Sequence, residues 1–174
     1  GLALENQRLF DQTQNALAEM DTLYNASAEL NTAQTYADIL KVFEDYAAVS
    51  RRAQMLSIGL FDTPWTSESR PRSVELLAVN APDNLDPQNL RLPLNLGVET
   101  VITPNEYTFI SNVEQDTRVN QNLRRYFLET LGVHAAAFFP LVVAGRWVGY
   151  INVYYPTPTL FGENALRRAM AIST

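Results

Sequence analysis

The chain has 174 residues, with no cysteine, one histidine and one lysine, which excludes disulfides, cysteine nucleophiles, thiolate metal sites and multi-histidine metal sites. Hydrophobic residues make up 47% and charged residues 18%, so the chain can bury a sizeable core and is not intrinsically disordered. Its net charge of −6 does not favour nucleic acid or an acidic membrane surface as a partner, and no apolar stretch is long enough to span a bilayer.

The two ends of the sequence indicate a piece of a longer protein. Gly1 does not look like a natural start, residues 172–174 read as the middle of a helix, and the N-terminus lacks the basic and apolar regions of a signal peptide. We expect two units: a linker helix of coiled-coil type over residues 1–31, and a globular domain over residues 32–174 whose final helix is truncated.

Residues 2–30 contain no proline or glycine and carry a seven-residue repeat. Such a repeat favours a coiled-coil seam, because about 3.5 residues per turn keep one stripe facing the partner helix. Polar residues at some seam positions cost stability but can fix the register. The alternative is that the stripe packs on the protein's own core, and both arrangements can hold for different turns. The predicted seam consists of Leu2, Asn6, Leu9, Thr13, Ala16, Met20, Leu23 and Leu30, with Phe10, Leu17 and Tyr24 in the adjacent row.

The next segment predicts a second helix followed by strands. Thr35 and Asp38 have the spacing of a capping box, and this helix is expected to run to residue 51 or 52. Residues 55–61 and 73–80 alternate as strands, and the loop that joins them contains Trp65. Residues 81–97 are rich in proline and asparagine, which predicts loop with a short edge strand at 90–92.

The second half predicts a short strand, a helix, a hairpin and a final helix. Residues 107–111 read as a strand, and residues 120–131 as a helix ended by Gly132. Two long strand patterns, 134–143 and 147–155, are joined by a tight turn at 144–146. Residues 161–171 begin the last helix. This order predicts an α+β fold: an antiparallel sheet of five to six strands with helices packed on it, preceded by a long helix.

Several segments resemble the GAF domain, a small-molecule-binding and signalling fold of the profilin-like and PAS-like type. Residues 139–153 are similar to its paired closing strands, and residues 109–113 with Asp116 to the segment before its internal helix. Phe161 with Glu163 resembles the start of its closing helix. Residues 4–10 resemble the signalling helix that joins sensory domains in bacterial multidomain sensors. PAS is the main competitor, but two helices before the first strand fit GAF better.

The resemblance implies a cytoplasmic bacterial signalling protein similar to a two-component sensor histidine kinase, and it also limits the chemistry. Covalent bilin attachment and the methionine sulfoxide reductase branch of the family need cysteine, which is absent. The cyclic-nucleotide branch resembles an Asn-Lys…Phe…Asp-Glu pattern, of which Phe161 alone could match here. No phosphate-binding loop and no Gly-x-Ser-x-Gly elbow occur. We therefore expect no enzyme activity, no metal and no cofactor.

In this fold the resemblance implies a pocket between one sheet face and the loop-helix segment at about 100–132. Strand alternation predicts that Phe138, Tyr150 and Asn152 share one face, with Phe109 and Tyr126 closing over it. Arg118, like Arg124 and Arg125, is a candidate for an anionic ligand, because guanidinium binds carboxylate or phosphate. The candidate ligand-binding residues are Phe109, Arg118, Tyr126, His134, Phe138, Tyr150 and Asn152.

Simpler interpretations stand beside these. The aromatic residues can fill the core, the arginines can be solvated, His134 can be a packed strand residue, and Trp65 and Trp147 are expected to be packing residues. Two functions follow. The first is a non-catalytic sensory module, homodimeric through its N-terminal helix, that binds a small molecule. The alternative is a ligand-free dimerisation spacer in a multidomain sensor. An enzyme would need titratable groups that converge in the cavity, and the sequence offers few.

Overall fold

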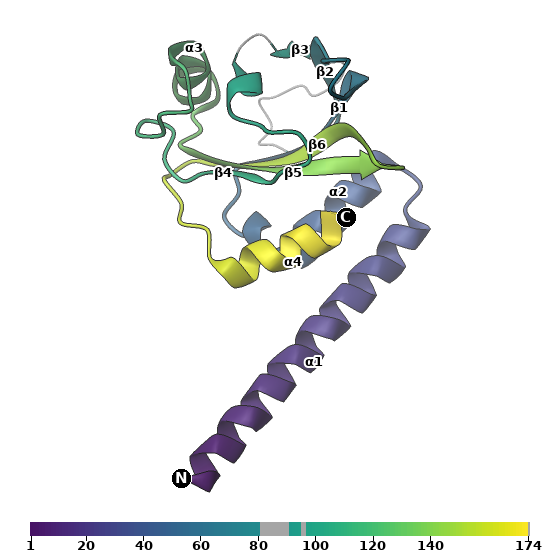
Figure 1. Ribbon diagram of the computed structural model, residues 1–174, viewed down its shortest axis with the longest axis vertical. Helices are drawn as coiled ribbons and strands as arrows, with labels where there is room; N and C mark the ends of the chain where they lie inside the picture. Colours follow the sequence, from purple (N-terminus) through teal and green to yellow (C-terminus); the bar gives the residue numbers. More distant parts are fainter. Residues whose placement is uncertain (81–90, 95–96, 174) are drawn as a thin grey trace.

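The structure, a computed structural model, describes residues 1–80, 91–94 and 97–173 (Figure 1). Within these residues one antiparallel sheet has the strand order β3-β2-β1-β6-β5-β4, so β1 and β6 form its centre. The expected α+β fold with a sheet of five to six strands is confirmed. The strands are β1 (Met55–Trp65), β2 (Ser73–Asn80), β3 (Arg91–Pro93), β4 (Thr108–Ile110), β5 (Ala135–Val143) and β6 (Arg146–Tyr155).

The two faces of the sheet have different covers, and each encloses its own hydrophobic core. One face, here called the helical face, is covered by α2 (Tyr36–Tyr46), α4 (Glu163–Ser173) and the end of α1 (Leu2–Thr32) (Figure 1). The opposite face, here called the loop face, lies under the segment 97–133. This segment carries η3 (Val98–Thr100), α3 (Gln121–Arg125) and the π-helix η4 (Tyr126–Leu131).

Helix α1 divides into an outer part and a part that belongs to the domain. Near its C-terminal end Ala26 is buried, and Leu23 and Leu30 are half-buried against the helical-face core. Leu23 and Leu30 thus pack on their own domain, the arrangement given above as the alternative to a seam, and the coiled-coil seam itself stays a prediction. The outer turns extend away from the domain (Figure 1), where Leu9 is 50% and Met20 66% exposed. The other predicted seam residues are also exposed: Leu2, Asn6, Thr13 and Ala16.

The predicted capping box of α2 is confirmed. The Asp38 main-chain N–H donates to Thr35 Oγ1 at 3.2 Å, and the Thr35 N–H donates to Asp38 Oδ2 at 2.9 Å. The helix ends at Tyr46, before the predicted end at 51–52, and a 3₁₀ turn, η1 (Ala48–Ser50), follows it. The Ser50 hydroxyl satisfies main-chain acceptors of the last turn, the carbonyls of Glu44 and Ala47. The chain can therefore leave the helix early and turn into β1.

The ends of several other helices and strands differ from the predicted ends by a few residues. Residues Ala144 and Gly145 alone form the turn of the last hairpin, and both have positive φ, as a two-residue turn of the I′ type requires. Helix α4 begins at Glu163, two residues later than predicted. Trp65 is the last residue of β1 and pairs with Trp147, so its prediction as a loop residue is wrong. Of the edge strand predicted at 90–92, residue 90 lies outside the described residues, and β3 is found one position later.

Strands β1 and β6 approach each other closely at Gly149. A Cβ atom at this position would lie 2.0 Å from the carbonyl oxygen of Gly59 and 3.0 Å from Leu60 Cα. These neighbours are main-chain atoms and cannot rotate away. The spacing of the two central strands therefore depends on a residue without a side chain.

We expect Gly149→Ala to lower the free energy of unfolding by at least about 2 kcal/mol, because the added methyl group must force the central strands apart. The measurement is urea denaturation followed by far-UV circular dichroism. Gly162→Ala is the matched control, since a Cβ there meets nothing within 4 Å, and we expect it to change little. Equal stability of the two variants would contradict the close-packing interpretation.

Candidate functional site

The loop face carries a buried polar pair at the centre of the sheet. Ser57 on β1 lies opposite Asn152 on β6, and Ser57 Oγ donates to Asn152 Oδ1 at 2.5 Å. Both residues are almost fully buried. Asn152 also lies opposite Phe138 on β5, and strand alternation puts it on the same face as Tyr150. The prediction that Phe138, Tyr150 and Asn152 share one face is confirmed.

Three tyrosines surround this pair. Tyr150 and Tyr154 project from β6 and are buried, and Tyr126 of η4 packs against the same core from above. Burial raises the pKa of Tyr150 and Tyr154 well above the ordinary tyrosine value, and proximity to Tyr126 adds to the effect. Burial also raises the pKa of Tyr126. All three hydroxyls therefore stay protonated and neutral near neutral pH.

The structure places Phe109 on the other side of the sheet. Its ring packs on Phe139 at 5.9 Å and on Phe161 at 5.3 Å between ring centroids, within the helical-face core. The expectation that Phe109 closes over the face of Phe138, Tyr150 and Asn152 is therefore wrong. The reason is the register of β4 on β5, in which Phe109 pairs with Ala137, a residue that faces the helices.

His134 is half-buried at the start of β5. Its main-chain N–H donates to the Tyr155 carbonyl at 2.8 Å, and its carbonyl accepts from the Val113 N–H at 2.9 Å. These two bonds anchor the loop that precedes α3 to the end of the sheet. The backbone of His134 thus has a structural role that the sequence did not predict, and ligand contact by its imidazole stays a prediction.

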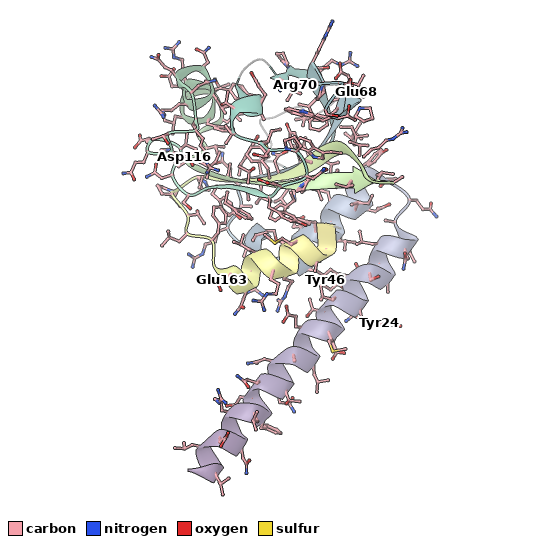
Figure 2. The ribbon with its side chains drawn as sticks, viewed as in Figure 1. Tyr24, Tyr46, Glu68, Arg70, Asp116 and Glu163 are labelled. Atoms are coloured by element: carbon pink, nitrogen blue, oxygen red, sulfur yellow. The ribbon has the colours of Figure 1, made fainter. Side chains whose placement is uncertain are left out.

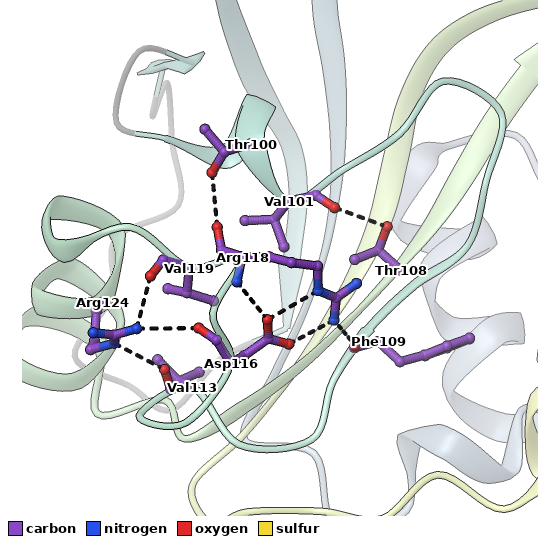
Figure 3. A network of polar contacts seen from close by, with 9 residues as sticks. All are labelled: Thr100, Val101, Thr108, Phe109, Val113, Asp116, Arg118, Val119 and Arg124. Atoms are coloured by element: carbon purple, nitrogen blue, oxygen red, sulfur yellow. Dashed lines mark hydrogen bonds and ion pairs between the residues drawn. The ribbon is translucent and has the colours of Figure 1, made fainter.

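Two arginines hold the segment that covers the loop face (Figure 3). Arg118 Nε and Nη2 donate to both carboxylate oxygens of Asp116, at 3.0 and 2.6 Å, and Nη2 also donates to the Phe109 carbonyl at 2.6 Å. Arg124 donates to three main-chain carbonyls at 2.9–3.2 Å, those of Val113, Asp116 and Val119. Both guanidiniums are thus engaged in fixing the segment, a role that sequence analysis missed. Arg125, in contrast, makes an exposed contact of 4.0 Å with Glu129.

The ion pair between Asp116 and Arg118 lowers the pKa of the Asp116 carboxyl. The Arg118 guanidinium, through its hydrogen bonds, holds the pKa of the Asp116 carboxyl below its ordinary value of 3.8, against the opposing effect of partial burial. A carboxylate whose pKa is lower in the folded state contributes stability in full above its unfolded-state pKa. This contribution is lost as the pH falls through the lowered value.

The arrangement offers hydrogen-bonding groups and aromatic rings rather than reactive groups. Among residues 1–80, 91–94 and 97–173, no group of three or more histidine, aspartate and glutamate residues is placed to hold a metal ion. No helix in the same residues is both long and apolar enough to cross a bilayer. A face with neutral hydroxyls, one amide and aromatic walls can bind a small molecule by shape and hydrogen bonds.

By its fold, the protein is an α+β domain whose sheet has helices on one face and a loop-helix segment over the other. The GAF domain family model matches residues 31–174, so the chain belongs to the GAF domain family. No curated protein sequence matches the chain.

Solved structures show the same fold at low sequence identity. One is a domain assigned to a two-component sensor histidine kinase of Sinorhizobium meliloti 1021 (20% identity, TM-score 0.58, covering 81% of this chain and 88% of that one). Another is the phycocyanobilin-bound GAF domain of a cyanobacterial phytochrome (14%, 0.60, 88% of each chain). A third is the GAF domain of an Acinetobacter phosphoenolpyruvate-protein phosphotransferase (17%, 0.58, 90% and 88%).

We expect Asp116→Asn to lower the free energy of unfolding by about 1–2 kcal/mol at neutral pH, because charge-assisted hydrogen bonds to Arg118 are lost. The difference in the free energy of unfolding between this variant and the wild-type protein should shrink as the pH falls below 3.8, because the wild-type carboxylate then becomes protonated and loses its charge. Urea denaturation at a series of pH values, from neutral to about pH 3, measures this difference. Asp45→Asn, which removes an exposed ion pair with Lys41, is the control and should have little effect at any pH. A pH-independent difference for Asp116→Asn would contradict the ion-pair account.

Proposed function

We propose that this chain is a non-catalytic sensory module of a cytoplasmic bacterial signal-transduction protein, and that it couples a small molecule to its terminal helices. Membership of the GAF family supports the proposal, as do similar domains in a sensor histidine kinase and a phytochrome. One observation carries it: α1 and α4, the first and last helices of the chain, contact each other on the face opposite the candidate site. Both connections to neighbouring domains would therefore start from one helical layer.

Strand β6 links the two faces. Tyr150 faces the candidate site, while its neighbour Ile151 faces the helices. Further along the strand, Tyr155 donates its hydroxyl hydrogen bond to the Val49 carbonyl and packs its ring on Phe161 at 5.5 Å. Val49 follows α2 and Phe161 precedes α4. A ligand that shifts β6 would thus change the support of both helices, which is the differential contact that signalling needs.

The ligand chemistry follows from the loop face. Tyr126, Tyr150 and Asn152 supply neutral hydrogen-bonding groups, and Phe138 supplies an apolar wall. Arg118 is held by Asp116 and by a main-chain carbonyl, which disfavours a role as a free anion receptor. The proposed ligand is therefore a small, largely uncharged molecule. Without cysteine, a thioether-linked chromophore is excluded.

The outer turns of α1 support a homodimer as the partner arrangement. We expect the wild-type chain to be a dimer in sedimentation velocity experiments and Leu9→Glu to shift it to the monomer, because a charge would enter the seven-residue stripe. Leu4→Glu is the matched control: Leu4 is 76% exposed on the same helix but lies outside the stripe, so the dimer should persist. A wild-type chain that stays monomeric at high concentration, or a loss of dimer in both variants, would contradict the seam.

We expect native mass spectrometry of freshly purified protein to show a bound small molecule, and Tyr126→Phe to reduce its occupancy severalfold, since a hydrogen bond to the ligand is lost. Tyr36→Phe on the exposed side of α2 is the control and should retain the wild-type occupancy. If no preparation contains a bound molecule and no compound in a metabolite set raises the melting temperature, the ligand-free spacer becomes the better account.

A further inference from the structure

A concave site lies at the end of the sheet where β1 passes into β2. It is a groove of about 350 Å³ lined by Trp65, Arg70, Pro71, Arg72, Leu94 and Glu99. We call it the Trp65 groove. Figure 2 shows Arg70 and Glu68 in the connection between the two strands, on the side of the sheet away from α4. None of the six lining residues is among the candidate ligand-binding residues predicted from the sequence.

The aromatic wall of the groove is held rigidly. The indole of Trp65 stacks on Trp147 with ring centroids 4.9 Å apart and an interplanar angle of 23°. Phe61 meets both rings edge-on, at 5.7 Å from Trp65 and 4.9 Å from Trp147. Trp147 is buried, whereas Trp65 is half-buried and lines the groove. A ring supported in this way is preorganised for a planar ligand, because its orientation costs nothing further on binding.

Two cationic side chains border the same groove. The guanidiniums of Arg70 and Arg72 make no ion pair or hydrogen bond among the described residues, in contrast to those of Arg118 and Arg124. The backbone beneath Arg72 is nonetheless fixed: its N–H donates to Asp62 Oδ1 at 3.0 Å, and its carbonyl accepts from the Leu94 N–H at 3.0 Å. Unengaged guanidinium beside an aromatic ring is the combination that binds a carboxylate and stacks on a flat ring.

Glu99 adds a selective element. Its Oε2 accepts a hydrogen bond from the Gly97 N–H at 3.2 Å, which holds the carboxylate near one wall of the groove. This fixed negative charge disfavours a ligand with two negative charges. It also provides an acceptor for a hydroxyl or amino group on the ligand.

We propose that the Trp65 groove binds a planar aromatic monocarboxylate that carries a hydroxyl or amino substituent. The ring stacks on Trp65, the carboxylate is bound by Arg70 and Arg72, and the substituent donates to Glu99. The proposal concerns a site separate from the candidate residues around Ser57 and Asn152, and it does not depend on the ligand proposed there.

The experiment follows the indole N–H signals of ¹⁵N-labelled protein by NMR during titration with 4-hydroxybenzoate. The chain has two tryptophans, and Trp65→Phe assigns the signal of the groove. We expect a saturable shift of the Trp65 signal. The Arg70→Gln/Arg72→Gln double variant should bind at least about tenfold more weakly, and Arg125→Gln, the control on an exposed helix position, should bind like the wild-type protein.

Comparison ligands test each part of the proposed chemistry. Benzoate lacks the donor, cyclohexanecarboxylate lacks the planar ring, and phenyl phosphate carries a second negative charge, so all three should bind more weakly than 4-hydroxybenzoate. Dispersed amide spectra verify that each variant is folded. The proposal is overturned if 4-hydroxybenzoate gives no saturable shift, if the double arginine variant binds like the wild-type protein, or if cyclohexanecarboxylate binds as tightly.

Discussion

The pairing of β1 with β6 is the contact on which the rest of the structure depends. Gly149 lets the two strands approach until a Cβ atom would touch the carbonyl oxygen of Gly59, and the bond from Ser57 to Asn152 joins them across the loop face. Both strands lie at the centre of the sheet, with β2 and β3 attached on one side and β5 and β4 on the other. A change in their spacing would disturb both cores at once, because each strand contributes side chains to both.

The aromatic residues of the loop face form one continuous packed chain rather than separate clusters. Ring contacts, with successive centroids 4.9–6.1 Å apart, run from Trp65 through Trp147, Phe61, Tyr150, Phe138 and Tyr154 to Phe127. This chain begins at the Trp65 groove and ends at Phe127 within η4. A close-packed core transmits displacement because its rings have few alternative positions. The Trp65 groove and the candidate residues around Ser57 and Asn152 therefore share one mechanical support.

Local sequence signals predicted the elements well, and long-range contacts account for the differences. The capping box of Thr35 and Asp38 and the final hairpin depend on residues close in sequence, and both were predicted. The side of Phe109 depends on which residue of β5 it pairs with, and alternation within a three-residue strand cannot decide that. Alternation ends after residue 61 and predicts a loop that contains Trp65, yet β1 resumes its pairing with β6 at Trp65 after an irregular stretch.

In the candidate site, too, local sequence signals predicted some features, and long-range contacts decide the others. Alternation along β5 and β6 was enough to place Phe138, Tyr150 and Asn152 on one face. The engagement of Arg118 and Arg124 could not be predicted, because their acceptors are mostly main-chain carbonyls brought close by the loop itself. An arginine in a loop sequence looks the same whether it binds a ligand or its own backbone. The spacing of Asp116 and Arg118, two residues apart, was the one local signal for an internal ion pair.

Helix α1 connects the two parts of the proposed function, because it packs on its own domain at one end and is proposed to pair with a second copy at the other. Its seven-residue repeat continues without interruption from the exposed Leu9 to the half-buried Leu23 and Leu30, but the two ends of the stripe have different partners. A seam between two copies can include Leu23 only if α1 separates from α2 and α4, since those leucines cannot contact both partners at once. The domain therefore limits how far such a seam extends. Any change in the helical layer that loosens Leu23 would lengthen the seam, and any change that tightens it would shorten the seam. In the proposed dimer, the polar residues Asn6 and Thr13 would keep the outer seam weak enough for this competition to be balanced.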